Sequence, residues 1–372
     1  MAERRAMAPG MTDDYFMRKA LALAERGRGQ TNPNPMVGAL VVDADGVIVG
    51  RGAHRVAGGP HAEVIALLEA GARARGSTLY CTLEPCSHTG RTGPCAPLVA
   101  EAGIRRAVIA MEDPNPIVHG RGLAHLRQRG VSVETGILAE DAARQNEVFI
   151  TNVTRHRPHV VAKIALSIDG RIAASGGARV DLTGEAANRI IQRQRAEVDA
   201  IAVGSSTILA DDPLLTARGA YRQRPLTRVV FDRRLRTPAD ARLLTTRPSG
   251  PIIVMSSRSN VDARRSAAGA LERAGARVVA MESAALDSWF AWLLRDAGIT
   301  SLVVEGGAAL HRTLLDAGLV DAVHAYITPM RLGSAGVPWM PVERFTLSEL
   351  DDRGAHWFGS DVRVEGYVHR HH

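Results

Sequence analysis

Hydrophobic and polar positions follow two alternating patterns along the chain. Residues 13–26 carry apolar side chains at helical spacing, which predicts a helix with Thr12 as its N-cap. Short apolar runs then alternate with helical segments and with turns rich in Gly, Pro, Asn and Asp. Strands are expected at 39–42, 47–50, 78–83, 107–110 and 131–134, and helices at 61–74, 97–103 and 123–130.

The same alternation restarts after residues 146–158, which include the polar run that starts at Thr154, and we place a domain boundary there. Most later strands are continuous apolar runs, which is typical of a sheet covered on both faces. These strands are expected at 160–166, 200–203, 228–232, 252–255, 276–280, 301–305 and 322–328. The pattern predicts an α/β protein with a disordered extension at 1–11 and domains at 12–152 and 158–370.

Composition narrows the class of protein. The net charge is +7, but the basic residues are scattered and aromatic residues make up only 4%. This argues against a nucleic-acid partner, which would need a basic patch and stacking platforms. No apolar run reaches the roughly 18 to 20 residues of a membrane span, and no secretion signal is recognisable, so we expect a cytoplasmic protein without a membrane partner.

The strongest chemical signal is His61-Ala62-Glu63 followed by Pro85-Cys86 and then Cys95. One imidazole and two thiolates suit tetrahedral Zn²⁺ and leave its fourth position open for water, as in catalytic sites. Glu63 is placed to move protons, and this arrangement is typical of zinc deaminases. Eight residues separate the cysteines where two are usual, so His88 stays an alternative to Cys95 as the third ligand.

Each of these residues also has an ordinary structural interpretation. A histidine at a helix start is usually a surface residue, and cysteines near a strand end are usually small buried side chains, as we expect for Cys81. The order of the motif favours the deaminase, because a non-catalytic zinc site leaves Glu63 without a role. Asn34, in the loop Asn32-Pro33-Asn34-Pro35, is equally a turn residue or a contact to a pyrimidine edge.

The second half has weaker signals and no Gly-x-Gly-x-x-Gly motif. Gly306-Gly307 joins an expected strand to a helix and is either a phosphate site or a plain turn. Lys163 lies in a strand expected to be buried, so it needs a partner such as Asp169 or a substrate group. Arg233 or Arg234 could meet the 2′-phosphate of NADPH, or simply be solvated.

Several of these motifs together resemble the bifunctional riboflavin-biosynthesis deaminase/reductase family. They are residues 32–38, 60–63, 82–88, 90–92 with Cys95, and 113–116, and the resemblance extends over most of the chain from Asp13. It implies a cytidine-deaminase-like three-layer α/β/α domain followed by a dihydrofolate-reductase-like α/β domain. It also implies zinc-dependent hydrolytic deamination of a 2,5-diamino-6-(phosphoribosylamino)pyrimidinone, and then NADPH reduction of the ribosyl arm to ribityl.

The resemblance also assigns residues to each ligand. In the deaminase it places Asn34, His88 and Arg91 near the substrate. In the reductase it places Lys163, Asp169, Arg195, Leu215, Arg218 and Glu305 near the substrate, and Ala165, Thr207, Asp211 and Gly307 near NADPH. We expect a homo-oligomer, either a dimer or a tetramer, because such layered domains often pair through edge elements.

The chain departs from the family in the second half. Arg179, Asp181, Leu182 and Thr183 stand where a serine and a tryptophan are common, and Pro329-Met330-Arg331-Leu332-Gly333 replaces a lysine-containing run. Arg179 can still bind a substrate phosphate, better than serine. These departures leave two alternatives: a paralogue in a specialised pathway such as toxoflavin-type azapteridine synthesis, or a deaminase with an inactive reductase domain.

Overall fold

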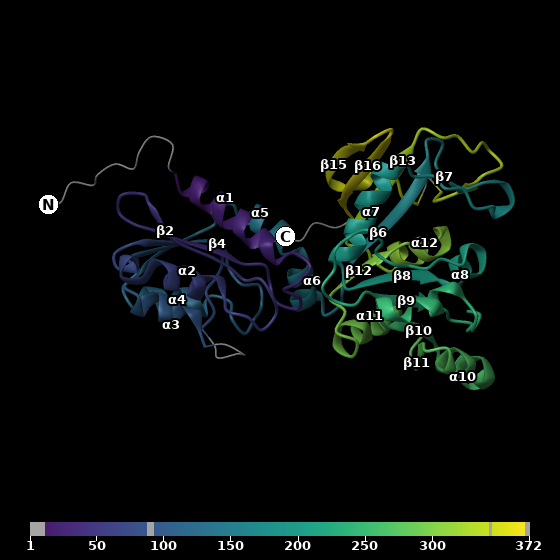
Figure 1. The fold of residues 1–372 in the computed structure, drawn as a ribbon, viewed down its shortest axis with the longest axis horizontal. Helices are drawn as coiled ribbons and strands as arrows, with labels where there is room; N and C mark the ends of the chain where they lie inside the picture. The colour runs from purple at the N-terminus through teal and green to yellow at the C-terminus, as the bar shows by residue number, and fades with distance from the viewer. Residues whose placement is uncertain (1–11, 88–92, 342–343, 369–372) are drawn as a thin grey trace. The chain divides into compact units, whose positions relative to one another are not determined.

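The computed structural model describes residues 12–87, 93–341 and 344–368 (Figure 1). The chain divides into two compact units, Met1–His156 and Arg157–His372. The extension expected at 1–11 and the last two residues of the expected second domain, 369–370, lie outside the described residues. Within the described residues, no helix has the length and hydropathy that a membrane crossing requires.

The first unit is built on a five-stranded sheet in the order β2-β1-β3-β4-β5. β1 pairs antiparallel with β2 and β3, whereas β3, β4 and β5 are parallel. The strands are β1 (Gly38–Val42), β2 (Ile48–Ala53), β3 (Thr78–Leu83), β4 (Arg106–Met111) and β5 (Ser132–Thr135). The helices are α1 (Asp13–Ala24), α2 (Ala62–Ala70), α3 (Cys95–Glu101), α4 (Arg121–Gln128), α5 (Ala139–Gln145) and α6 (Glu147–Arg155).

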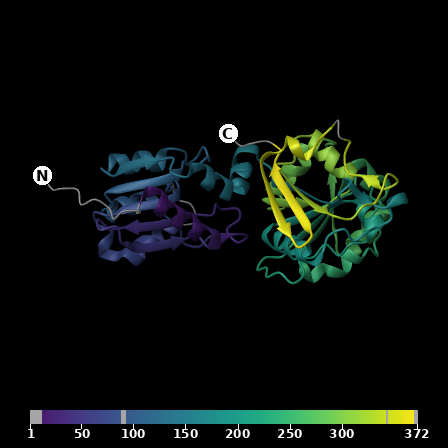
Figure 2. The same ribbon diagram turned by 90° about the horizontal axis from the view of Figure 1, so that it is seen from above.

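Alternate residues of the central strands pack into two separate cores. Val41, Cys81 and Ile109 join one core with α2, α3 and α4. Leu40 and Tyr80 join the other core with α1 and α5. Helices flank the sheet on both sides in each view (Figures 1 and 2). The expected three-layer α/β/α arrangement is therefore confirmed, and Thr12 caps α1 by accepting a hydrogen bond from the Tyr15 amide at 3.4 Å.

The second unit contains a nine-stranded sheet in the order β11-β10-β9-β8-β12-β6-β13-β16-β15. Its strands are β6 (His159–Ser167), β8 (Ala200–Gly204), β9 (Thr227–Phe231), β10 (Ile252–Ser257), β11 (Arg277–Met281), β12 (Ser301–Val304), β13 (Ala322–Thr328), β15 (Asp351–Phe358) and β16 (Asp361–Tyr367). Its helices are α7 (Glu185–Glu197), α8 (Ser205–Asp211), α9 (Arg258–Ala263), α10 (Arg265–Arg273), α11 (Leu286–Arg295) and α12 (Ala308–Asp316). β7 (Arg171–Ala173) and β14 (Val337–Pro338) form a separate small sheet.

In this sheet the strands β6, β8, β9, β10, β11, β12 and β13 are parallel, and all except β11 at the edge are mostly buried, as their apolar runs predict. Val160 and Ala162 of β6 pack with α11 and α12 on one face, and Ile201 and Val203 of β8 pack with α8 and α10 on the other. The carboxyl ends of these strands meet at one edge of the sheet, which is where ligands bind in open α/β sheets.

Two features differ from the sequence-based expectation. The boundary segment at 146–158 contains a helix that we did not predict, α6, and near its end Arg157 forms a buried ion pair with Asp321 at 2.7 Å. The antiparallel hairpin of β15 and β16, drawn in yellow in Figure 2, was not expected. β15 is mostly exposed and its hydrophobic pattern is therefore weak.

Candidate active sites

The three expected zinc ligands converge in the first unit. The ligand atoms of His61, Cys86 and Cys95 all lie within 4.8 Å of one another. His61 Nδ1 is 3.2 Å from the Cys95 sulfur and 3.6 Å from the Cys86 sulfur. Ligand atoms around a tetrahedral zinc ion are roughly 3.3 to 3.8 Å apart, given bonds of about 2.0 to 2.3 Å. The donor set and spacing therefore fit Zn²⁺. His88, the alternative ligand, lies outside the described residues.

Local structure explains why ligands far apart in sequence meet. His61 is the N-cap of α2, and Cys95 is the first residue of α3. Cys86 follows the carboxyl end of β3, and its carbonyl accepts a hydrogen bond from the Ala96 amide at 3.0 Å. The hydrogen bond between the two sulfurs lowers the pKa of Cys86 and raises the pKa of Cys95, so the pair shares one proton.

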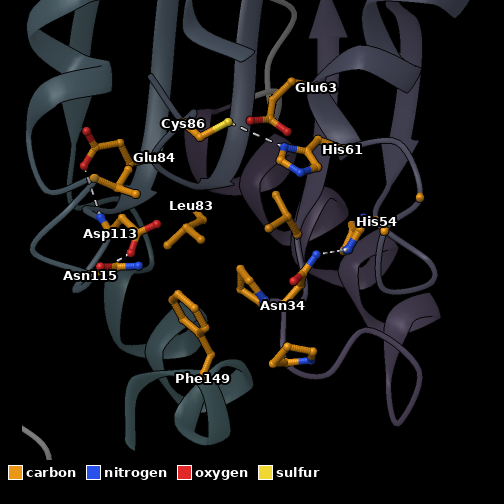
Figure 3. A pocket seen from close by; sticks show the side chains of 16 residues that line it. Asn34, His54, His61, Glu63, Leu83, Glu84, Cys86, Asp113, Asn115 and Phe149 are labelled. Carbon is orange, nitrogen blue, oxygen red and sulfur yellow. Dashed lines mark hydrogen bonds between the residues drawn. The ribbon is translucent and has the colours of Figure 1, made fainter. Parts of the chain in front are cut away.

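Glu63 lies on the first turn of α2 with only 4% of its surface exposed. Burial raises its pKa to about 7, which suits a carboxyl group that takes up and releases protons near neutral pH. Figure 3 shows Glu63 beside His61 and Cys86 at one end of a cavity of about 360 Å³. Cys81, by contrast, is fully buried in β3 and lies outside the metal cluster.

Asn34 faces the same cavity and has a defined amide orientation. His54 Nδ1 is 3.0 Å from the carbonyl of Pro60, which can only accept, so Nδ1 carries the ring proton. Burial lowers the pKa of His54, and the neutral ring therefore accepts at Nε2 from Asn34 Nδ2 at 3.1 Å. This assignment leaves the Asn34 carbonyl oxygen directed away from His54 (Figure 3).

Other residues of this cavity were not identified from the sequence. His54, Asp113, Asn115 and Phe149 line its walls, although the sequence indicated only a loop at 113–116 and nothing at His54 or Phe149. Asn146, which we had placed in a boundary segment, clamps the loop that carries Asn34, through hydrogen bonds to the backbone of Met36 at 2.8 and 3.0 Å. Arg91, expected near the substrate, lies outside the described residues.

A second cavity of about 360 Å³ lies in the second unit. Its lining contains five cationic side chains and two carboxylates. Eight of the expected residues line it: Lys163, Arg179, Arg195, Thr207, Asp211, Leu215, Arg218 and Glu305. Arg242 also lines it and was not expected. The excess of positive charge fits a ligand that carries phosphate.

Glu305 organises this cavity. It follows β12 and receives a bidentate pair of hydrogen bonds from Arg195 at 2.6 and 2.7 Å. Lys163 Nζ lies 3.6 Å from the same carboxylate. Burial alone raises the pKa of Glu305, but Arg195 and Lys163 outweigh it and lower the pKa to about 2. The buried Lys163 therefore has Glu305 as its partner in the protein.

The remaining expected residues lie elsewhere. Asp169, our suggested partner for Lys163, instead accepts hydrogen bonds from the Ser167 hydroxyl and from the backbone of Leu332 and Gly333, so that suggestion was wrong. Ala165 is two residues beyond Lys163 on the same face of β6, and Gly307 is the N-cap of α12. Neither these three residues nor Arg233, which is exposed in the loop after β9, lines the cavity.

Comparisons with known proteins agree with this geometry. The family model "Cytidine and deoxycytidylate deaminase zinc-binding region" matches residues 11–111, and "RibD C-terminal domain" matches residues 158–364. Riboflavin biosynthesis protein RibD of Aquifex aeolicus is 38% identical over 86% of this chain and 88% of its own length. The protein of the same name from Escherichia coli is 40% identical over 87% and 89%.

Solved structures extend the agreement to the fold. RibD of Acinetobacter baumannii has a TM-score of 0.82 at 34% identity, covering 95% of this chain and 98% of the other. A diaminohydroxyphosphoribosylaminopyrimidine deaminase/5-amino-6-(5-phosphoribosylamino)uracil reductase from Thermotoga maritima has a TM-score of 0.81 at 32% identity with the same coverage.

Fold and sites together define a bifunctional enzyme: a zinc-dependent deaminase fused to an NADPH-dependent reductase with a dihydrofolate-reductase-like fold. Both halves are matched over most of their length by relatives that share both domains. The chain belongs to the RibD family of riboflavin biosynthesis. The alternatives of a specialised pathway or an inactive reductase domain are not favoured by these matches.

Proposed function

We propose that the first unit hydrolyses the 2-amino group of a 2,5-diamino-6-(phosphoribosylamino)pyrimidinone, and that the second unit reduces the ribosyl arm of the product to ribityl with NADPH. The observation that carries the proposal is that one chain combines three metal-ligating side chains, among the described residues, beside a buried carboxylate with a separate cationic cavity. The names of the matched relatives support the choice of substrate.

In the deaminase, His61, Cys86 and Cys95 would hold zinc, which when bound makes water a nucleophile at neutral pH. Glu63 takes the proton of the attacking water and delivers a proton to the departing amine, so ammonia leaves as the carbonyl forms. Asn34 holds the ring through its carbonyl oxygen, which accepts a hydrogen bond from a ring or amino N–H. His88 and Arg91 remain expected contacts to the ring or the phosphate.

In the reductase, NADPH supplies the hydride when bound, and the chain supplies binding and orientation. Arg179, Arg218 and Arg242 give the cavity its excess positive charge and would bind the substrate phosphate. The side chains of Lys163 and Glu305 are largely buried, with 13% and 9% of their surface exposed, and would contact the ribose hydroxyls. Arg195 positions Glu305 through its bidentate contact.

The finer cofactor and substrate contacts extend this assignment. Leu215 would face the substrate. Ala165, Thr207, Asp211 and Gly307 would face NADPH, since all belong to β6, α8 or the turn before α12, near the carboxyl edge of the sheet. Asp169 accepts hydrogen bonds from the backbone amides of Leu332 and Gly333, in the segment after β13, and would shape the site by holding that segment in place.

We assign the protein to the cytoplasm, because its three cysteines are all free thiols, which suits a reducing compartment. We also propose a homo-oligomer, either a dimer or a tetramer, and no nucleic-acid partner. The sheet of the second unit ends in β15, where the side chain of Trp357 is 74% exposed. Light scattering of the purified protein tests the oligomeric state, and a single mass equal to one chain would contradict it.

The decisive experiment follows ammonia release and NADPH oxidation together, with zinc-loaded protein and the diaminopyrimidinone substrate. Wild-type protein should show both signals. Glu63→Gln should lose ammonia release, whereas Lys163→Met should keep ammonia release and lose NADPH oxidation. Glu69→Gln, an exposed substitution of the same kind on α2, should change neither signal. Ammonia release without NADPH oxidation by the wild-type protein would refute the reductase assignment.

A further inference from the structure

One asparagine at the corner between two helices holds the loop that carries Asn34. Asn146 is both the C-cap of α5 and the N-cap of α6, and it is only 2% exposed. Its Oδ1 accepts a hydrogen bond from the Met36 amide at 2.8 Å, and its Nδ2 donates to the Met36 carbonyl at 3.0 Å. Both backbone groups of Met36 are therefore bound by one side chain that lies 110 residues further along the chain.

The side chain of Asn146 is not used as a helix cap. Asparagine is among the preferred N-cap residues, because its side-chain oxygen can accept a hydrogen bond from an amide in the first helical turn. At the start of α6 this oxygen accepts from Met36 instead, and the helix, which is described throughout, has no side-chain cap. The amide nitrogen also donates to the Ala142 carbonyl of α5 at 3.4 Å. The side chain therefore serves a contact to a distant segment rather than the helix that it begins.

The loop that contains Asn34 has few backbone groups by which it can be held. Pro33 and Pro35 flank Asn34 and have no N–H to donate. The backbone N–H of Asn34 itself donates within the loop. The next N–H along the chain belongs to Met36, and Asn146 binds it. Asn146 therefore fixes the backbone two residues from the side chain that is expected to contact the pyrimidine.

The same corner also positions another wall of the deaminase cavity. Phe149 follows Asn146 by about one turn of α6 and lines the cavity together with Asn34. Figure 3 shows Phe149 at the end of the cavity away from His61 and Glu63. Because Asn146 binds the Asn34 loop and also begins α6, the separation of Asn34 and Phe149 across the cavity depends on this one residue.

We propose that Asn146 is a positioning residue of the deaminase, which sets the affinity for the substrate by holding Asn34 where its carbonyl oxygen meets the pyrimidine ring. This inference rests on the proposed deaminase function and adds a residue to it. Asn146 is not among the described residues that line the cavity, so it acts on the substrate through Asn34. The three metal ligands and Glu63 lie on α2, on α3 and after β3, so the zinc chemistry should not depend on Asn146.

The test measures ammonia release by the full-length, zinc-loaded protein over a range of substrate concentrations. Asn146→Asp keeps the size of the side chain and the acceptor for the Met36 amide, but it places a carboxylate oxygen against the Met36 carbonyl. KM should rise about 3- to 10-fold, which is the effect of weakening one hydrogen bond to a neutral group, while kcat stays within about 2-fold. Zinc content should stay at the wild-type level.

A double-mutant cycle separates positioning from a general loss of stability. Asn34→Ala should raise KM by itself, and adding Asn146→Asp should raise it no further, because the group through which Asn146 acts is gone. The matched control is Gln145→Glu, the same amide-to-carboxylate change at the preceding residue. Gln145 Nε2 donates to the Leu21 carbonyl at 3.0 Å and to the Glu25 carboxylate at 2.6 Å, so this variant should destabilise the first unit to urea without changing KM.

Asn146→Ser is a second variant in case Asn146→Asp does not fold. Serine also caps helices well, but it is too short to bind both backbone groups of Met36, so the same rise in KM is expected. The inference is overturned by an unchanged KM, by an equal rise in Gln145→Glu, or by additive effects in the Asn34→Ala background. It is also overturned if neither Asn146 variant folds while Gln145→Glu does, since the role is then structural. If the wild-type protein with zinc bound releases no ammonia, the proposed deaminase function itself fails.

Discussion

Glu84 precedes Pro85 and Cys86 in the zinc motif, and its side chain binds four backbone amides of neighbouring segments. Its Oε1 accepts hydrogen bonds from the amides of Gly122 at 2.9 Å and Leu123 at 3.3 Å, and its Oε2 accepts from the amides of Asp113 at 3.1 Å and Gly120 at 3.0 Å. The side chain is only 3% exposed. Glu84 therefore ties the end of β3 to the loop that lines the deaminase cavity and to the start of α4.

Substituting Glu84→Gln keeps the shape of the side chain and replaces one acceptor oxygen with a donor. Two of the four backbone N–H groups then face an amide NH₂ and lose their partner. Each unsatisfied buried donor costs about 1 to 3 kcal/mol, so the free energy of unfolding of the first unit should fall by about 2 to 6 kcal/mol. Zinc affinity should also fall, because the brace lies two residues from Cys86.

The assay uses the distribution of tryptophan. All four tryptophans, Trp289, Trp292, Trp339 and Trp357, lie in the second unit. Urea unfolding followed by tryptophan fluorescence therefore reports the second unit, whereas far-UV circular dichroism reports both. Glu84→Gln should shift the dichroism transition of the first unit to lower urea and leave the fluorescence transition unchanged.

The matched control is Glu69→Gln, which breaks an exposed ion pair with Arg51 and should cost less than about 1 kcal/mol. The reasoning is refuted if Glu84→Gln unfolds at the same urea concentration as Glu69→Gln. It is also refuted if the fluorescence transition moves together with the dichroism transition, since the damage would then not be local to the first unit.

Three further predictions concern the two sites. Glu63→Gln should lower the rate of ammonia release by about 10²- to 10⁴-fold while zinc content, measured by atomic absorption, stays at the wild-type level. Zinc affinity should rise with pH and zinc binding should release protons, because the proton shared by the two cysteines must leave before both sulfurs can bind the metal. Competition with a chelator at several pH values measures this affinity. An affinity that does not change with pH would contradict the prediction. Glu305 has a folded pKa of about 2 against 4.5 for the free side chain, so its contribution to stability is present above pH 4.5 and is lost as the pH falls towards 2. Urea unfolding by tryptophan fluorescence should therefore weaken more steeply from pH 5 to pH 3 in wild type than in Glu305→Gln, and equal slopes would count against this assignment.

The sequence by itself determined the layered α/β architecture and indicated which residues are candidate zinc ligands. Buried parallel strands such as β6, β8 and β12 are continuous apolar runs, and their pattern needs no knowledge of their neighbours. His61, Glu63, Cys86 and Cys95 could be recognised because metal chemistry demands particular side chains in a particular order. Both signals depend on the order of residues along the chain, so they can be recognised without knowledge of the fold.

Only the tertiary structure decided which groups become partners across the fold. Lys163 was expected to need a partner such as Asp169, six residues away, or a substrate group. Within the protein it pairs with Glu305 at the end of a neighbouring strand. Arg157, in the polar run where we placed the domain boundary, forms a buried pair with Asp321. Such pairs depend on strand order and register, which bring together residues more than 100 positions apart. A charged residue in sequence therefore indicates that a partner is needed, and the fold determines which residue that partner is.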